Sequence, residues 1–433
     1  MDLNNVFNHY QQFLLNSIQL YFSKNGQGIP AVEMPELESE LFNGRQLNHH
    51  ETIIVLTALA PHVQPAIFDQ AIQQFLPAGG DFAEFGGVKG TNTRYMLPTG
   101  DTVLFLLAGA DVNKRKQVLH YFDPGHWFRS QNVLSLEPVK DGEPRMSGKI
   151  ILSNECVDLL TTGIIGKPTF GPDFPARLVT TQMEWADLII ADQTAKQIGD
   201  IQTWLHCNQT FIADWQMGKR IKPGYRALFY GPSGTGKTLA ATLLGKQFGQ
   251  EVYRIDLSQV VSKYIGETEK NLEKIFEKAE HKNWILFFDE ADALFGKRSS
   301  VQNAHDKYAN QEVSYLLQRV EDFPGLIILA SNFKSNIDQA FTRRFNAVVK
   351  FAMPSQAERL ALWKSAMPAK AVLAADVDLE LISLRYEMSG SSIVSVIHYA
   401  SLQAINRQST TIGLKDILEG IRREFEKEER VFR

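Results

Sequence analysis

The sequence predicts an α/β protein built on a parallel sheet that is followed by a helical lid. Over residues 226–351, five short apolar segments with strand character alternate with segments of helical pattern. This alternation is typical of a parallel sheet with helices on both faces. After Pro354 only helical patterns remain. The strand candidates are Ala227–Tyr230, Val252–Leu257, Ile285–Asp289, Leu326–Ser331 and Val348–Phe351, and the later helical candidates are Gln356–Ala366, Leu379–Arg385, Ser392–Asn406 and Leu414–Glu428.

A glycine-rich segment, GPSGTGKT, lies between the first strand candidate and the helix that follows it. It fits the phosphate-binding pattern G-x-x-x-x-G-K-[ST] without a mismatch. Glycines let successive backbone N–H groups turn onto phosphates, and the next helix adds its positive end. Lys237 is expected to reach the β- and γ-phosphates, and the hydroxyl of Thr238 to bind Mg²⁺. The motif consists of Gly231, Pro232, Ser233, Gly234, Thr235, Gly236, Lys237 and Thr238, and Leu239 follows it on the helix.

The chain is long enough for two or three domains, each with its own core. Residues 1–165 are expected to form a small α+β domain of winged-helix type that binds a partner. Residues 166–190 read as a linker, because GKPTFGPDFP holds three prolines. Residues 191–352 are expected to form the large α/β subdomain of the predicted sheet, and residues 353–433 a helical lid.

The first domain shows helical patterns but no predicted catalytic constellation. Apolar residues recur at helical spacing over residues 4–22, and a second helix is expected at His49–Leu59, ending near Pro61. The stretch Gly79–Gly100 is rich in Gly, Thr and Asn and predicts loops or a hairpin. His126, in DPGHWF, is expected to be structural, because a lone histidine beside Trp is more often packed than catalytic.

Composition restricts the classes of partner. A net charge of −4 and a sequence pI near 6.2 give no general attraction to nucleic acid or anionic lipid. Cys156 and Cys207 lack metal-ligand spacing and are expected to be free and buried. No apolar run is long enough to cross a bilayer, and the N-terminus lacks the pattern of a signal peptide, so the cytosol is the expected location.

Polar residues follow two of the strand candidates. In ILFFDEADALF the strand ends in Asp289 and Glu290, which are expected at the carboxyl edge of the sheet, where ligands bind. Asp289 can hold Mg²⁺, and Glu290 can polarise water for attack on a γ-phosphate. The alternative is an acidic helix cap after a core strand. In LIILASN, Asn332 can orient the same water.

A pair of arginines, Arg343 and Arg344, follows in AFTRRF. It could be an ordinary surface pair. It could also reach the active site of a neighbouring subunit and neutralise charge in the transition state, which would require an oligomer.

These motifs, in this order, resemble those of the AAA+ ATPases over roughly residues 190–428. The resemblance implies an ATP- and Mg²⁺-dependent hydrolase that forms a hexameric ring. In the lid, MSGSSIVSVIHYA is similar to the second sensor of the AAA group, where the backbone at Gly390 and Ser391 would approach the nucleotide.

The segment VSKYIGETEKNLEKIF is similar to the first pore loop of the same group, which grips a polypeptide in the ring's channel. The resemblance places Tyr264 and Ile265 in the channel, with Lys263 before them and Gly266 permitting a turn. The alternative is that Tyr264 is a core aromatic. The helix behind the loop is expected to be anchored by Leu272, Ile275, Phe276 and Ala279.

The string LFGKRSSVQNAHDKYANQEVSYLLQRVEDFPGLIILASN is similar to bacterial ATPases encoded with extracellular contractile injection systems, and LTALAP in the first domain supports the same resemblance. It implies a second pore loop at Arg298–Asn310, with His305 facing the channel. A solvated loop is the alternative. The helix after it is expected to bury Val313, Leu316, Leu317 and Val320.

The leading hypothesis is therefore a ring-forming ATP hydrolase that pulls on a protein client, with roles in assembling or loading a contractile particle. No protease motif of the type H-E-x-x-H occurs. A second hypothesis is a nucleotide-gated scaffold that recruits its partner through residues 1–165. A third is a DNA-directed motor, against which the acidic balance counts.

Overall fold

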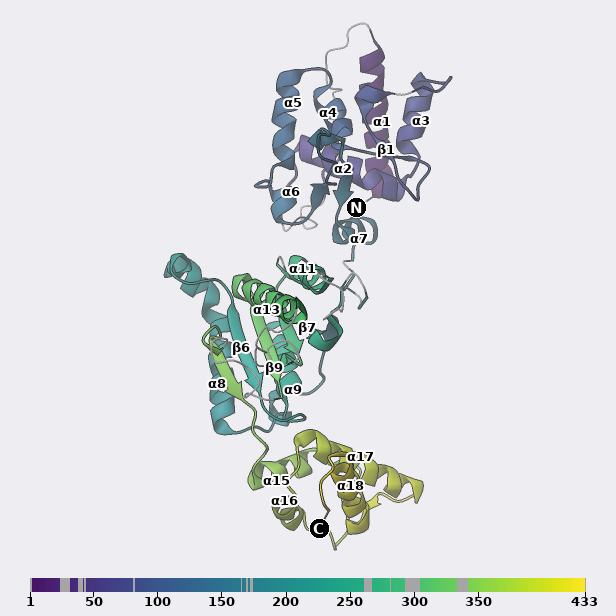
Figure 1. Ribbon diagram of the computed structural model, residues 1–433. Helices are drawn as coiled ribbons and strands as arrows, with labels where there is room; N and C mark the ends of the chain where they lie inside the picture. The colour runs from purple at the N-terminus through teal and green to yellow at the C-terminus, as the bar shows by residue number, and fades with distance from the viewer. Residues whose placement is uncertain are drawn as a thin grey trace. The chain divides into compact units, whose positions relative to one another are not determined.

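The computed structural model resolves into two compact units, Met1–Lys167 and Pro168–Arg433 (Figure 1). It describes residues 2–23, 32–37, 42, 44–80, 82–164, 166–168, 170–171, 174–260, 267–280, 282–292, 304–332 and 342–432, and only the backbone for residues 259 and 304–312.

The N-terminal unit consists mainly of helices. They are α1 (Leu3–Phe22), α2 (His49–Val63), α3 (Ile67–Phe75), α4 (Gly100–Ala108), α5 (Val112–Leu119), α6 (Trp127–Ser130) and α7 (Asn154–Thr162), with short 3-10 turns at Ala83–Phe85, His120–Phe122 and Arg145–Ser147. Two antiparallel ladders join β1 (Val88–Lys89) to β2 (Met96–Leu97), and β3 (Leu134–Leu136) to β4 (Ile150–Leu152). The winged-helix expectation stays a prediction.

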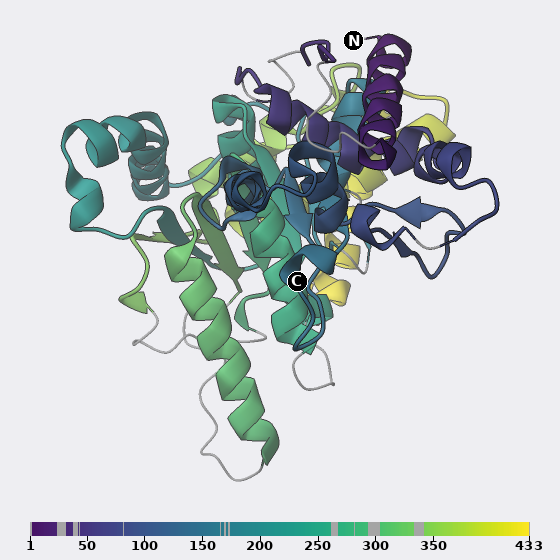
Figure 2. The same ribbon diagram turned by 90° about the horizontal axis from the view of Figure 1, so that it is seen from above.

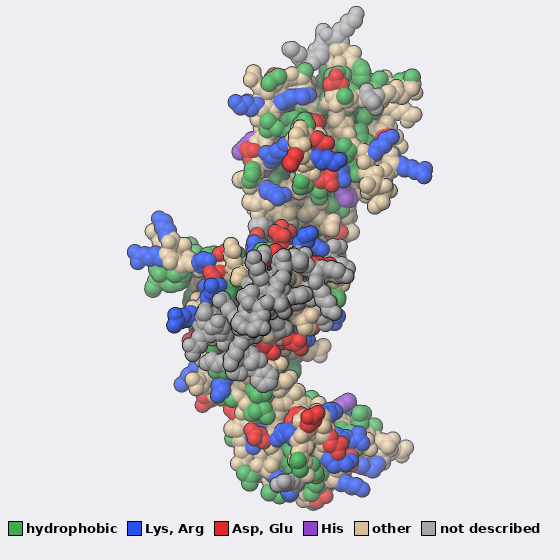
Figure 3. Space-filling model, viewed as in Figure 1, with side chains coloured by type: hydrophobic (Ala, Val, Ile, Leu, Met, Phe, Trp, Pro, Cys, Tyr) green, Lys and Arg blue, Asp and Glu red, His purple; other side chains and the backbone are tan. Residues whose placement is uncertain are grey.

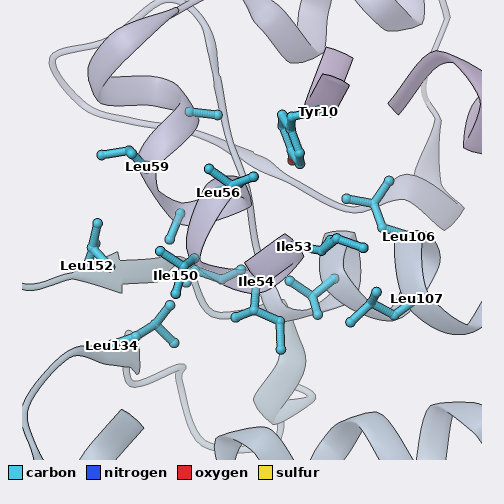
Figure 4. Packing of buried hydrophobic residues seen from close by; sticks show 14 of the residues in the cluster. Tyr10, Ile53, Ile54, Leu56, Leu59, Leu106, Leu107, Leu134, Ile150 and Leu152 are labelled. Carbon is cyan, nitrogen blue, oxygen red and sulfur yellow. The ribbon is translucent and has the colours of Figure 1, made fainter. Parts of the chain in front are cut away.

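Helix α2 forms the centre of the N-terminal core. Its residues from Glu51 to Pro61 are buried, and apolar side chains of α1, α4, β3 and β4 lie around it (Figure 4). The helix begins at a capping box, in which the side chains and backbone amides of Asn48 and Glu51 pair reciprocally. It continues past Pro61 to Val63, because a proline in the last turn removes only one hydrogen bond. Packing around α2 therefore holds this unit together.

The second unit is built on a six-stranded sheet in the order β10-β6-β9-β8-β7-β5. Five strands are parallel, as predicted: β6 (Tyr225–Tyr230), β7 (Glu251–Asp256), β8 (Trp284–Asp289), β9 (Leu326–Ser331) and β10 (Ala347–Lys350). The sixth, β5 (Arg177–Val179), pairs antiparallel with β7. It lies within residues 166–190, the stretch expected to be a linker.

Helices cover both faces of this sheet. On one face α8 (Asp192–Gln209) and α9 (Lys237–Phe248) pack against the strands, and on the other face α11 (Glu267–Ala279) and α13 (Ala304–Asp322) do so. The remaining helical pieces are α10 (Leu257–Val260), a π-helical turn at Thr210–Asp214 and 3-10 turns at Trp185–Asp187 and Met217–Lys219. The expected anchors Leu272, Ile275, Phe276 and Ala279 of α11 are buried, as are Leu316, Leu317 and Val320 of α13. Val313 is partly buried. Figure 2 shows α13 extending past the sheet.

The lid after Pro354 contains α15 (Gln356–Ser365), α16 (Leu379–Arg385), α17 (Gly390–Asn406) and α18 (Leu414–Lys427), in agreement with the predicted helices. They enclose a core around the fully buried Trp363. The expectation that no strand occurs here is corrected by a short parallel ladder between β11 (Val372–Leu373) and β12 (Thr411–Ile412). Two residues per strand leave no periodic pattern.

The two cysteines differ in exposure. Cys156 is buried, and burial raises the pKa of its thiol to about 12. Cys207 is exposed on α8, which corrects the expectation that both are buried. Among the described residues no single helix is both long and apolar enough to cross a membrane, although α2 and α3 together, bent by 102°, would meet that criterion.

Candidate nucleotide-binding site

The glycine-rich loop lies between the carboxyl end of β6 and the start of α9. Gly231 and Gly234 have φ values of +148° and +75°, which glycine adopts readily. A Cβ atom at Gly231 would lie 1.8 Å from the carbonyl oxygen of Phe351, so only glycine fits there. The loop geometry required for phosphate binding is therefore present.

The side chain of Lys237 is buried beneath this loop. Its Nζ donates to the carbonyl oxygens of Gly231 (2.6 Å) and Pro232 (3.0 Å) and to Oδ1 of Asn332 (3.1 Å). Burial lowers the pKa of Lys237, and the nearby carboxylates of Asp289 and Asp292 oppose that shift. Three oxygen acceptors thus surround the ammonium group, which is the environment that phosphate oxygens would also provide.

Neighbouring parallel strands bring the predicted polar residues to one edge of the sheet. Tyr230 at the end of β6 is in register with Ser331 at the end of β9, and Asn332 follows directly. Asp289 ends β8, the strand next to β9. The contact between Lys237 and Asn332 joins the glycine-rich motif GPSGTGKT to the strand segment LIILASN.

The turn after β8 carries the two predicted carboxylates. Glu290 is exposed and has φ +54°, a left-handed conformation that costs a non-glycine residue about 1–2 kcal/mol. Two bonds hold the turn: Glu290 N–H donates to Oδ1 of Asp289 (3.0 Å), and Ala291 N–H donates to the carbonyl of Ala330 (2.8 Å). Such local strain is frequent at functional sites.

Asp289 has a partner that sequence reasoning missed. Nη2 of Arg254, on β7, lies 2.9 Å from Oδ2 of Asp289. Arg254 interrupts the apolar strand VYRID, and a charged residue inside a core strand is the signal that could have identified it. Asp292 was also missed: its Oδ1 accepts the backbone N–H of Asn332 (3.4 Å).

The lid contacts the glycine-rich loop directly. The backbone N–H of Ser391 donates to the carbonyl of Gly234 (3.2 Å), and a Cβ at Gly390 would lie 3.4 Å from the same oxygen. Residues Gly390 and Ser391 therefore lie beside the loop, and their approach to the nucleotide stays a prediction. Leu188 reaches it from the other side, since a Cβ at Gly236 would lie 2.8 Å from its Cδ1. No motif marked Leu188 in the sequence.

The two arginines differ in their surroundings. Nη1 of Arg344 lies 3.0 Å from Oε1 of Glu321. Arg343 is exposed and forms no ion pair or hydrogen bond with another residue that the structure describes. The structure does not bring either arginine to the glycine-rich loop of the same chain.

Several predicted residues lie outside the described part of the chain. These are the first pore loop, Lys263, Tyr264, Ile265 and Gly266, and residues 298–303 of the second. The second loop is shorter than predicted, because α13 already begins at Ala304 and includes His305 in its backbone. The side chain of His305 is not among those described.

The residues present fit a magnesium–nucleotide complex. The hydroxyl of Thr238, at the start of α9, and the carboxylate of Asp289, at the end of β8, are the hard oxygen donors that Mg²⁺ prefers. In the described part of the chain no group of three or more His, Cys, Asp and Glu residues could hold a metal ion unaided.

In this parallel sheet the glycine-rich loop follows β6, the amide of Asn332 follows the neighbouring strand β9, and the carboxylate of Asp289 ends β8, the next strand along. This arrangement defines a P-loop nucleoside triphosphatase domain. Residues 227–353 match the family described as "ATPase family associated with various cellular activities (AAA)". The chain thus contains an AAA ATPase domain, preceded by a helix-rich N-terminal unit.

Three relatives are similar to about half of this chain. The "ATPase family gene 2 protein" of Schizosaccharomyces pombe is 33% identical over 206 residues, which are 46% of this chain and 25% of the relative. The "Proteasome-activating nucleotidase" of Aeropyrum pernix is 34% identical over 209 residues, which are 46% of this chain and 51% of the relative. The "26S proteasome subunit RPT4" of Saccharomyces cerevisiae is 31% identical over 211 residues, which are 47% of this chain and 48% of the relative. The chain thus spans about half, or less, of each relative's length.

Proposed function

We propose that this protein hydrolyses ATP with Mg²⁺ in the cytosol. The observation that carries the proposal is the contact of Lys237 with Asn332 at the sheet edge that also bears Asp289. Bound Mg²⁺ would supply positive charge that offsets the charge of the phosphates. Lys237 would exchange its carbonyl partners for the β- and γ-phosphates, while Thr238 and Asp289 would hold the ion.

Glu290 is the residue proposed to activate water. It is exposed at the edge of the sheet and held by a strained turn, so its carboxylate can face the space beside the γ-phosphate. Asn332, whose Oδ1 contacts Lys237, would orient the same water.

The test of this function is the variant Glu290→Gln. Replacing the carboxylate by an amide removes the base but keeps the shape, so turnover should fall by about 10²–10⁴-fold. Binding of a fluorescent ATP analogue should change by less than about threefold. The exposed Glu277→Gln on α11 is the matched control and should retain wild-type turnover. Near wild-type hydrolysis by Glu290→Gln would overturn the assignment.

A ring of six subunits that acts on a protein client is the second part of the proposal. It rests on the resemblance of the pore-loop segment, and the name of one relative, a proteasome-activating nucleotidase, supports a protein client. On the face drawn in Figure 3, basic and acidic side chains are mixed on the described surface of each unit. This mixture favours a protein over a nucleic acid as the binding partner. Movement of the lid against the glycine-rich loop would transmit the nucleotide state.

Assembly or loading of a contractile injection particle is the most specific form of this proposal, and it rests on sequence resemblance alone. The competing function is a nucleotide-gated scaffold. Tyr264→Ala distinguishes them: a translocating ring should keep its ATPase activity and lose unfolding of a fluorescent protein with an unstructured tail. Unfolding of that probe by Tyr264→Ala at the wild-type rate would overturn the role of Tyr264, and failure of the wild type itself to unfold the probe would favour the scaffold.

A further inference from the structure

The N-terminal unit contains an open recess of about 590 Å³ that none of the predicted motifs explains. Three segments meet there: the residues before α2, the first turn of α2, and the turn between α5 and α6. Its lining includes Arg45, His50, Glu51, Tyr121, His126 and Trp127.

A buried carboxylate forms the floor of this recess. Glu51 is 2% exposed. Its Oε1 accepts the indole N–H of Trp127 (2.7 Å), and its Oε2 accepts the backbone N–H of Asn48 (2.9 Å). Because both oxygens accept N–H groups of the chain, the carboxylate orients its neighbours.

The guanidinium of Arg45 is held at the recess by two contacts. It lies 4.7 Å from the centroid of the Trp127 ring, and its Nη2 lies 3.4 Å from Oε1 of Glu51. The Arg45 side chain is 49% exposed. Within the described residues it makes no other hydrogen bond, so most of its five N–H donors remain available to a ligand.

Imidazole groups add further donors. Nδ1 of His126 accepts the backbone N–H of Phe128 (3.3 Å), which places the proton of the neutral ring on Nε2, 3.6 Å from Glu51. Nδ1 of His50 lies 3.4 Å from the hydroxyl of Tyr121. Burial lowers the pKa values of both histidines, so at neutral pH they are uncharged donors.

The first turn of α2 contributes positive potential. His49 and His50 are its first two residues, and their amides have no partner within the helix. The positive end of this helix of 15 residues therefore points into the same region as Arg45. Together, these groups favour a ligand of negative charge.

We propose that this recess binds a carboxylate group of a partner polypeptide, from an Asp or Glu side chain or a C-terminus. Arg45 would form the charge-assisted hydrogen bonds, and His50 would add a neutral donor. Arg45 is already paired with Glu51, whose charge repels any anion but repels a doubly charged phosphate more than a singly charged carboxylate. The inference is independent of ATP hydrolysis.

The experiment measures peptide binding to the full-length protein without nucleotide. The probe is a fluorescein-labelled decapeptide of alternating Glu and Ser, followed by anisotropy. We expect Arg45→Gln to weaken its binding by at least about tenfold, since one charge-assisted bond is lost. His50→Gln should weaken it by about two- to fivefold. The matched control, Arg94→Gln, removes an exposed arginine outside the recess and should leave affinity unchanged.

All three variants should be folded at the assay temperature by circular dichroism, although Arg45→Gln should unfold at a somewhat lower temperature because it loses the ion pair with the buried Glu51. Equal affinity of wild type and Arg45→Gln, or absence of binding at millimolar peptide, would overturn the proposal. Tighter binding of a Lys–Ser decapeptide would indicate a cation site instead. Displacement of the acidic probe by equimolar inorganic phosphate would indicate a phosphate site and would also overturn it.

Discussion

At the nucleotide site, the two groups of opposite charge that matter most already have partners within the chain. Lys237 donates to Gly231 and to Asn332, and Asp289 pairs with Arg254. Binding of Mg²⁺ and ATP must therefore replace these hydrogen bonds and this ion pair by new contacts to the ligand. An exchange keeps the buried ammonium satisfied at every stage, which avoids the high free energy of an unpaired buried charge.

Arg254 competes with Mg²⁺ for Asp289 if this exchange occurs. Arg254→Gln should therefore lower the Mg²⁺ concentration needed for half-maximal binding of a fluorescent ATP analogue by about two- to fivefold, a modest effect because the Arg254 side chain is 42% exposed. Arg177→Gln, on the neighbouring strand in register with Arg254, is the control and should change nothing. A higher Mg²⁺ requirement in Arg254→Gln would show that the arginine supports the ion instead.

At the scale of elements, the lid and the glycine-rich loop meet through a glycine. A Cβ at Gly234 would lie 1.8 Å from Oγ of Ser391 and 2.7 Å from Oγ of Ser389. Gly234→Ala should thus push the lid away and weaken nucleotide binding by at least about tenfold. Part of the loss should return in Gly234→Ala combined with Ser391→Ala, because the closest atom is then removed.

Gly231→Ala provides the contrast. Its Cβ would meet the backbone carbonyl of Phe351 at 1.8 Å, so no second side-chain substitution should restore binding. In both single variants the alanine is also strained, because its backbone is held at a positive φ. Equal affinity of Gly234→Ala and the double variant would argue that strain alone, and not the lid contact, causes the defect.

The start of α18 depends on one carboxylate. Asp416 accepts two guanidinium N–H bonds from Arg407 (2.8 and 2.5 Å) and the backbone N–H of Gly413 (3.2 Å). The bonds from Arg407 chiefly lower the pKa of Asp416 below its ordinary 3.8. Asp416→Asn should destabilise the protein by about 1 kcal/mol at pH 7, because solvent screens the half-exposed Arg407.

The pH dependence has a definite sign. A lowered carboxyl pKa stabilises the folded state above pH 3.8, and that contribution is lost as pH falls through the lower folded pKa. Urea unfolding at pH 7.5 and 4.5 should give the same difference between wild type and Asp416→Asn, and the difference should shrink only below about pH 3.8. A difference that grows with acidity would contradict the assigned pair. Glu387→Gln, which removes an exposed carboxylate outside this pair, is the control.

The parts of this structure that sequence could predict are those with local patterns. The five parallel strands are continuous apolar runs, and the position of Asn332 followed from the end of one of them. The recess was not predictable, because Glu51 and His126 come together from separate segments through the packing of α2. Arg254 was missed for a related reason: its role arises from the register of β7 against β8, which no single-strand pattern reveals.

At the scale of the whole molecule, a ring would divide each active site between two subunits. Arg343 is exposed without a partner among the described residues, whereas Arg344 pairs with Glu321, so Arg343 is the better candidate for the neighbouring site. Arg343→Ala should lower turnover by about 10³-fold while nucleotide affinity stays the same. Arg344→Ala should have a smaller effect, since it loses a surface ion pair.

Mixing two inactive variants tests the division directly. Lys237→Ala lacks a working nucleotide site but keeps Arg343, and Arg343→Ala keeps the site but lacks the arginine. In mixed rings, a site from an Arg343→Ala subunit would receive Arg343 from a Lys237→Ala neighbour, and turnover should rise well above that of either variant alone. At equal amounts with random assembly, about a quarter of the interfaces would be complete. If mixing restores no activity although the subunits exchange, Arg343 does not act across a subunit interface.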